Sequence, residues 1–243
     1  YIQESDHLLL NLENSLIDRN TNQIDIIAKY LQLLGVTAVN FANDPVGDYD
    51  YNSTKNLIAR LKNNMIQSFG IGENLNESIK PHTIELRGEK SQQNVYIFSG
   101  MNSTKKFREE LHLYSDNNHP GINNLSPNRI EKNIEQVRAN DPSAIIIVYP
   151  HWSGREYSSL GSFEKIREKF NSFINAGADY VFGHGSHMAS SIERYENGEI
   201  AYCLGDFIYE HNGNIDNSYS VIVNLECVES EDGWDITPQY IPL

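Results

Sequence analysis

The chain has 243 residues, enough to bury a substantial core, and α/β folds of this length often form one domain. It carries 19 Lys and Arg residues against 33 Asp and Glu residues, a net charge of −14. A field of this sign repels phosphate backbones and anionic lipid headgroups, so nucleic acid is a poor candidate partner. We expect a single soluble domain over residues 1–243.

The cysteines and the apolar runs leave the cellular compartment open. Cys203 and Cys227 match no zinc spacing and cannot form a disulfide framework, so two reduced, buried thiols are expected rather than a disulfide. No apolar run reaches the roughly 18–20 residues of a membrane span, and residues 1–4 do not resemble a signal peptide. A membrane would be reached only through a segment absent from this chain.

The first quarter of the chain predicts two strand-helix steps. Apolar residues recur at helical spacing over 21–35, with Thr21 or Asn22 as the N-cap and Gly35 as the C-cap. The second strand opens into a polar loop at 43–48, and open α/β sheets bind ligands at such carboxyl strand ends. The predicted elements are a strand at 7–12 covered on both faces, a helix at 21–35, a strand at 36–42 and a helix at about 53–63.

The rest of the chain continues the alternation and then changes character. Residues 99–126 are polar and suggest loops with one short helix. The last third favours antiparallel hairpins, the first turning at Asn197-Gly198. The predicted elements are weaker strands near 81–87 and 93–98, a helix at 128–139, a strand at 144–149, a helix at 162–176, a strand at 180–182, and hairpin strands at 191–196, 200–209 and 218–228. This pattern predicts an α/β sandwich of mixed sheets flanked by helices.

Three of the eight histidines stand just past the end of an apolar strand: His151, His184 and His187. Parallel strand ends bring residues distant in sequence to one rim, and imidazole is the commonest neutral ligand of zinc, iron and manganese. A lone histidine in this position is usually a surface or capping residue. The three together leave a shared metal site and the structural interpretation about equally supported.

Carboxylates follow the strands on the same expected rim. Glu13 follows the first strand, Asp44 and Asp48 follow the second, and Asp206 follows the Cys203-Leu204-Gly205 stretch. A pair of divalent ions needs such a mixture of imidazole and carboxylate ligands. Asp48 is better explained as a turn former beside a glycine. For Glu13 and Asp44, the sequence supports a role as metal ligand and a role as turn former about equally.

Five motifs together resemble the CapA family of poly-γ-glutamate capsule proteins, which itself resembles the calcineurin-like metallophosphoesterases. The family's motifs are NLE, ANNH, HWG-x-E, GADxVxGHHPH and YSLGNF. They occur here in the family's order, from about residue 6 to 209, as Asn11-Leu12-Glu13, Ala42-Asn43-Asp44-Pro45, His151-Trp152, Gly177 to His184 and Tyr202 to Phe207. The resemblance implies a metallophosphatase-like fold, incomplete at the N-terminus because the opening strand and its aspartate are absent before Tyr1.

The resemblance also implies a site. Its metal residues carry over as Glu13, Asp44, His151, His184 and His187. Of these, His151 and Asp44 are the expected catalytic residues. Arg155 and Glu156 are the expected substrate-binding residues. The implied cofactors are divalent ions: Mn, Fe or Zn.

Several positions depart from the family's pattern. Pro45 replaces the histidine expected to protonate a leaving group, and Gly185 removes one histidine of GHHPH. Asp206 replaces the asparagine of YSLGNF, and Ser153 is inserted so that Glu156 is displaced by one position. With a ligand and an acid lost, a fully assembled binuclear phosphatase is not expected of this chain alone.

Two functions remain open from the sequence. The first is a metal-dependent hydrolase or transferase of the phosphoesterase type, acting on an anionic polymer or a phosphoester in capsule synthesis. The second is a non-catalytic binding or scaffold component of a polymer synthesis or export complex, with other capsule-synthesis proteins as partners. Under either function, the resemblance implies a place at the cell surface or outside the cell.

Overall fold

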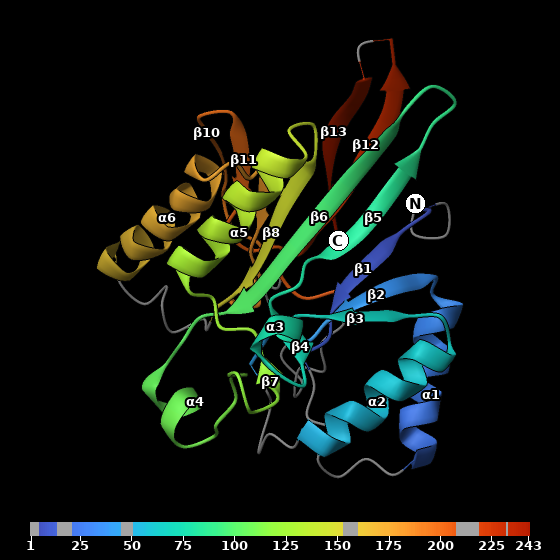
Figure 1. Cartoon of the computed structure of the whole chain (residues 1–243), viewed down its shortest axis with the longest axis vertical. Helices are drawn as coiled ribbons and strands as arrows, with labels where there is room; N and C mark the ends of the chain where they lie inside the picture. The colour runs from blue at the N-terminus through green and yellow to red at the C-terminus, as the bar shows by residue number, and fades with distance from the viewer. Residues whose placement is uncertain (1–4, 14–20, 45–50, 153–159, 208–218, 232) are drawn as a thin grey trace. The chain divides into compact units, whose positions relative to one another are not determined.

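The computed structural model describes residues 5–13, 21–44, 51–152, 160–207, 219–231 and 233–243 (Figure 1). The contacts divide the chain into two compact units. The first comprises Tyr1–His82 and Ser99–Leu125, and the second comprises Thr83–Phe98 and Ser126–Leu243. A single domain over the whole chain therefore stays a prediction.

The first unit contains a three-stranded parallel sheet, in the order β1-β2-β3, with two helices packed against it (Figure 1). Helix α1 buries Ile24, Ala28 and Leu31, spaced so that they share one face, and Gly35 follows it at φ 80°. β1 lies at the edge of this sheet, and all four of its residues are partly buried. The elements are β1 (Leu8–Asn11), α1 (Thr21–Leu33), β2 (Val36–Asn40), α2 (Tyr51–Asn63) and β3 (Gln67–Phe69).

Short elements complete the first unit. Sequence periodicity missed β3, β4 and α3, because segments of two to four residues are too short to show a period. The single short helix expected within 99–126 is α4, which Thr104 caps by accepting a hydrogen bond from the Phe107 amide. The elements are β4 (Ile71–Gly72), α3 (Leu75–Ser78), α4 (Lys105–Glu109) and β7 (Gly121–Ile122), with β4 and β7 antiparallel.

The second unit is built on a six-stranded sheet in the order β10-β11-β9-β8-β6-β5. Strand β8 is a fully apolar run at Ile145–Val148, buried as expected for a central parallel strand. Helices α5 and α6 lie side by side next to this sheet (Figure 1). The elements are β5 (His82–Arg87), β6 (Gln92–Met101), α5 (Pro127–Asn140), β8 (Ile145–His151), α6 (Leu160–Asn175) and β9 (Tyr180–Phe182).

Two antiparallel hairpins follow. The first was predicted but differs in its turn and length, and the second pairs the strand predicted near 218–228 with a strand at Gly233–Pro242 that was not predicted from the sequence. β10 (Ile192–Tyr195) pairs with β11 (Gly198–Ala201) so that Tyr195 faces Gly198, and the turn residues are Glu196 and Asn197 rather than Asn197 and Gly198. Gly198 is needed for close packing rather than for the turn, because a Cβ at this position would lie 2.6 Å from Ile174 Cδ1. β11 ends at Ala201, short of the predicted 209.

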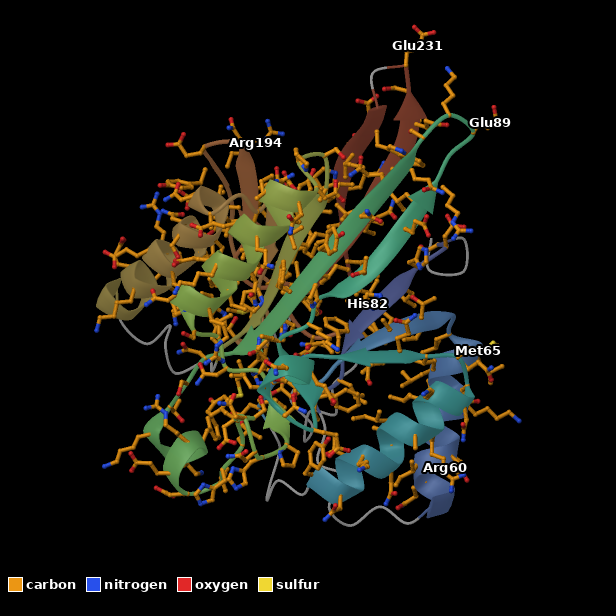
Figure 2. The ribbon with its side chains drawn as sticks, viewed as in Figure 1. Arg60, Met65, His82, Glu89, Arg194 and Glu231 are labelled. Atoms are coloured by element: carbon orange, nitrogen blue, oxygen red, sulfur yellow. The ribbon has the colours of Figure 1, made fainter. Side chains whose placement is uncertain are left out.

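The C-terminal hairpin comprises β12 (Val221–Ser230) and β13 (Gly233–Pro242). Its Glu229 carboxylate accepts hydrogen bonds from the amides of Glu89 and Lys90 and from the Ser91 hydroxyl. Figure 2 shows Glu89, in the connection between β5 and β6, near Glu231, which lies between β12 and β13. The cysteines are free thiols; Cys203 is buried, whereas Cys227 on β12 is only half buried. Within the described ranges, no helix has the length and apolar character needed to cross a bilayer.

Candidate functional site

The carboxyl ends of β8 and β9 bring two of the predicted histidines together in the second unit. The ladder between these parallel strands continues past β9, because the His184 amide donates to the Pro150 carbonyl and the Trp152 amide donates to the His184 carbonyl, each at 3.0 Å. His151 and His184 therefore sit opposite one another across neighbouring strands. The expected gathering of histidines at strand ends is in place for this pair.

The two imidazoles form one hydrogen-bonded pair. Their Nδ1 atoms lie 2.7 Å apart, and His151 is 0% and His184 4% exposed. One Nδ1 must donate a proton and the other must accept it, since two bare lone pairs at this distance would repel each other. The accepting ring must therefore be neutral, because only an unprotonated Nδ1 can accept a hydrogen bond.

Burial explains why the rings stay neutral. Desolvation lowers the pKa of His151 well below its usual value, and the nearby His184 and His187 lower it further. Desolvation also lowers the pKa of His184 to about 3, with a smaller opposing effect from the Tyr149 backbone. A neutral imidazole is the form that binds a metal ion.

His187 belongs to a second, separate pair. Its Nδ1 lies 3.1 and 3.2 Å from the two carboxylate oxygens of Asp206. The His187 side chain is 42% exposed, whereas the Asp206 side chain is 18% exposed. The sequence placed Asp206 near the rim as a carboxylate but did not show that it would pair with His187. The two residues are 19 positions apart, so their contact depends on how the intervening chain folds.

Two of the predicted carboxylates, Glu13 and Asp44, lie in the first unit, where asparagine side chains bond to the residues beside them. Asn11 Oδ1 accepts from Asn40 Nδ2 at 3.0 Å and from Asn43 Nδ2 at 2.9 Å. Asn43 Nδ2 also donates to the Leu12 carbonyl. These bonds fasten the segment before Glu13 to the segment before Asp44. Sequence reasoning missed Asn40, and the available signal was a polar residue closing the apolar strand β2.

The five predicted ligands are thus divided between the two units. Glu13 and Asp44 belong to the first unit, and His151, His184 and His187 belong to the second. Within the described ranges, no group of three or more His, Cys, Asp and Glu side chains is arranged to hold a metal ion. A site shared by all five stays a prediction. Pro45, Asp48, Ser153, Arg155 and Glu156 lie outside the described residues.

The buried pair is nevertheless chemically suited to a divalent ion of the zinc, iron or manganese type. Its two Nδ1 atoms lie together, and burial keeps further protons from competing for them. The ring that now donates from Nδ1 would have to carry its proton on Nε2 instead before both Nδ1 atoms could bind an ion. Two imidazoles fill only part of a coordination shell, so an ion bound here would require further donors. The pair fits as one element of a metal site.

Gly185 fixes the backbone beside this pair. Its φ is 114°, and a Cβ there would lie 1.9 Å from the Trp152 carbonyl oxygen and 3.0 Å from His151 Cε1. The contact with the carbonyl is far shorter than van der Waals distance, so the backbone conformation requires glycine. The histidine of the family's GHHPH motif cannot be accommodated in this conformation.

The fold is α/β of the metallophosphatase-like, calcineurin-like class. It is similar to the structure of sulfate thiohydrolase SoxB from Thermus thermophilus in complex with glycerol, with a TM-score of 0.53 and 12% sequence identity over 91% of this chain and 35% of that one. The chain belongs to the bacterial capsule synthesis protein family PGA_cap, whose sequence model matches residues 1–211. The expected CapA resemblance and fold class are confirmed.

Two curated relatives are similar over most of the chain. The capsule biosynthesis protein CapA of Bacillus anthracis is 25% identical over 232 residues, which cover 86% of this chain and 52% of the relative. The PGA biosynthesis protein CapA of Bacillus subtilis strain 168 is 25% identical over 218 residues, covering 85% and 54%. The chain spans about half the length of these relatives.

The buried pair predicts an acid-sensitive fold. A histidine with an ordinary pKa of about 6.5 when unfolded binds more protons in the unfolded than in the folded chain, where the pKa of His184 is about 3. Stability is therefore complete above about pH 6.5 and is lost as the pH falls toward 3. In urea titrations with a chelator present, His184→Asn should show a weaker pH dependence between these limits. A dependence equal to that of the parent chain would contradict the assignment.

Gly185→Ala should lower the free energy of unfolding by at least about 2 kcal/mol, because positive φ and overlap with the Trp152 carbonyl act together. Gly35→Ala is the matched control. It shares a positive φ of 80° but meets nothing within 4 Å, so it should cost only about 1 kcal/mol. Chemical denaturation of both variants compares the costs. Equal losses would show that the carbonyl overlap is absent.

Proposed function

We propose that this protein acts in the synthesis of a bacterial capsule polymer of the poly-γ-glutamate type, as a metal-dependent hydrolase or transferase on an anionic substrate. Family membership and the names of the two CapA relatives support the role in capsule synthesis. The single observation that supports catalysis is the buried, neutral pair formed by His151 and His184. A place at the cell surface is consistent with this role.

Each residue has a part in this proposal. His151, His184 and His187 are proposed to provide nitrogen donors, and Glu13 and Asp44 to add oxygen donors. His151 and Asp44 also line the reacting centre, while Arg155 and Glu156 contact the anionic substrate. A divalent ion held by these residues, Mn, Fe or Zn, would act as a Lewis acid and lower the pKa of bound water. The substrate is a phosphoester or the polymer itself.

A second function has its own supporting observation. The backbone at Gly185 excludes the family's histidine, which favours a non-catalytic binding component of a polymer synthesis or export complex. Such a component would keep the fold and the rim as a contact surface for the polymer or for other capsule-synthesis proteins. In that case the histidine pair would serve stability alone.

Metal content and hydrolysis discriminate between the two functions. After metal-replete expression, elemental analysis of the parent chain should find bound Mn, Fe or Zn, and nitrophenyl phosphate hydrolysis should depend on it. His184→Ala should lose most of the metal and at least about tenfold of the activity, since it removes a ligand. His119→Ala, which changes an exposed histidine in the first unit, should alter neither. A parent chain without metal would favour the non-catalytic component.

A further inference from the structure

His187 and Asp206 form a histidine-carboxylate pair, and the proposed function assigns no part to Asp206. The His187 Nδ1 faces both carboxylate oxygens, at 3.1 and 3.2 Å. An ionised carboxylate can only accept hydrogen bonds, so the proton must be on Nδ1. In the neutral ring, Nε2 then carries the lone pair. The carboxylate therefore selects one of the two tautomers.

The backbone around the pair holds both partners in place. The Asp206 carbonyl accepts from the Ser220 hydroxyl at 2.5 Å, and the Ala189 amide donates to the Tyr219 carbonyl at 2.7 Å. Ala189 is also bridged to Leu204, so three segments of the second unit interlock here. His187 adopts φ 62°, which non-glycine residues rarely do. The neighbouring segments thus fix the position of the ring.

The two partners differ in exposure in a way that suits a positioning role. The Asp206 side chain is 18% exposed and the His187 side chain 42% exposed. The carboxylate is consequently held in the fold, while the ring it orients reaches solvent. His187 is also close enough to the buried pair to influence the pKa of His151.

We infer that Asp206 is a positioning residue, which holds His187 with Nε2 as the ligand atom for a divalent cation at the rim. The inference rests on the proposed metal-dependent function. Histidines that bind metals almost always donate their other ring nitrogen to a carboxylate, carbonyl or water, and the partner fixes tautomer and ring orientation. The family's YSLGNF motif has asparagine at this position, so the charged partner is a property of this chain.

The first test reads the tautomer directly. ¹⁵N NMR of the full chain at pH 8, with His187→Gln used to assign the signals, should show Nδ1 protonated and Nε2 unprotonated. Asp206→Ala should shift His187 toward the Nε2-protonated form, and Asp206→Asn should give a mixture because an amide can accept or donate. A parent chain with Nε2 protonated, or an unchanged tautomer in Asp206→Ala, would overturn the inference.

The second test reads Mn²⁺ affinity by calorimetry. Asp206→Ala should bind Mn²⁺ about 10- to 100-fold more weakly than the parent, and Asp206→Asn should lie between them. Asp116→Ala is the matched control, because Asp116 also accepts from a histidine Nδ1, that of His119 at 2.8 Å, on the exposed surface of the first unit. It should leave the affinity unchanged.

The two tests separate the two proposals. Unchanged Mn²⁺ affinity in Asp206→Ala, with a parent chain that binds the ion, contradicts the positioning role and leaves the metal-dependent function standing. A parent chain that binds no Mn²⁺, Fe²⁺ or Zn²⁺ contradicts the metal-dependent function and, with it, the role of Asp206 toward a cation. The tautomer then still decides whether Asp206 orients the ring.

Discussion

The proposed site depends on one constraint, the desolvation of two imidazoles at neighbouring strand ends. A charged ring would be costly at 0% and 4% exposure, so His151 and His184 must be neutral and must satisfy each other. The same burial that imposes this cost leaves the rings unprotonated at neutral pH. Burial is therefore the reason both that the fold requires neutral rings and that the rings are in the form that binds a metal ion.

Aromatic rings and a glycine pack closely around the strand ends that carry the pair. Trp152 stacks on Phe170 at a centroid distance of 4.3 Å, and Phe170 stacks on Tyr202 at 5.7 Å. Gly183 allows the chain to pass close to the next strand, since a Cβ there would lie 2.1 Å from the Tyr202 carbonyl oxygen. These aromatic and glycine positions explain why the strand ends pack so tightly.

The sequence predicted the regular elements well and the close contacts poorly. The helix over 128–139 and the strand over 144–149 have strong periodicity or a continuous apolar run, and both appear as α5 and β8. The turn of the first hairpin was misplaced because Gly198 makes room for Ile174, a tertiary contact that no local pattern shows. For the same reason, Asn40 and the contact between His187 and Asp206 were not foreseen.

The central claim is that His151 and His184 form part of a divalent-metal site, and anomalous diffraction tests it most directly. Crystals of the full chain grown with Mn²⁺ should show an anomalous peak within bonding distance of a ring nitrogen of both histidines, close to the length of about 2.0–2.1 Å for zinc–nitrogen bonds in proteins. The hydrogen bond between the two Nδ1 atoms would be replaced by bonds to the ion. Crystals with Mn²⁺ bound elsewhere, and the two rings still hydrogen-bonded to each other, would contradict the claim.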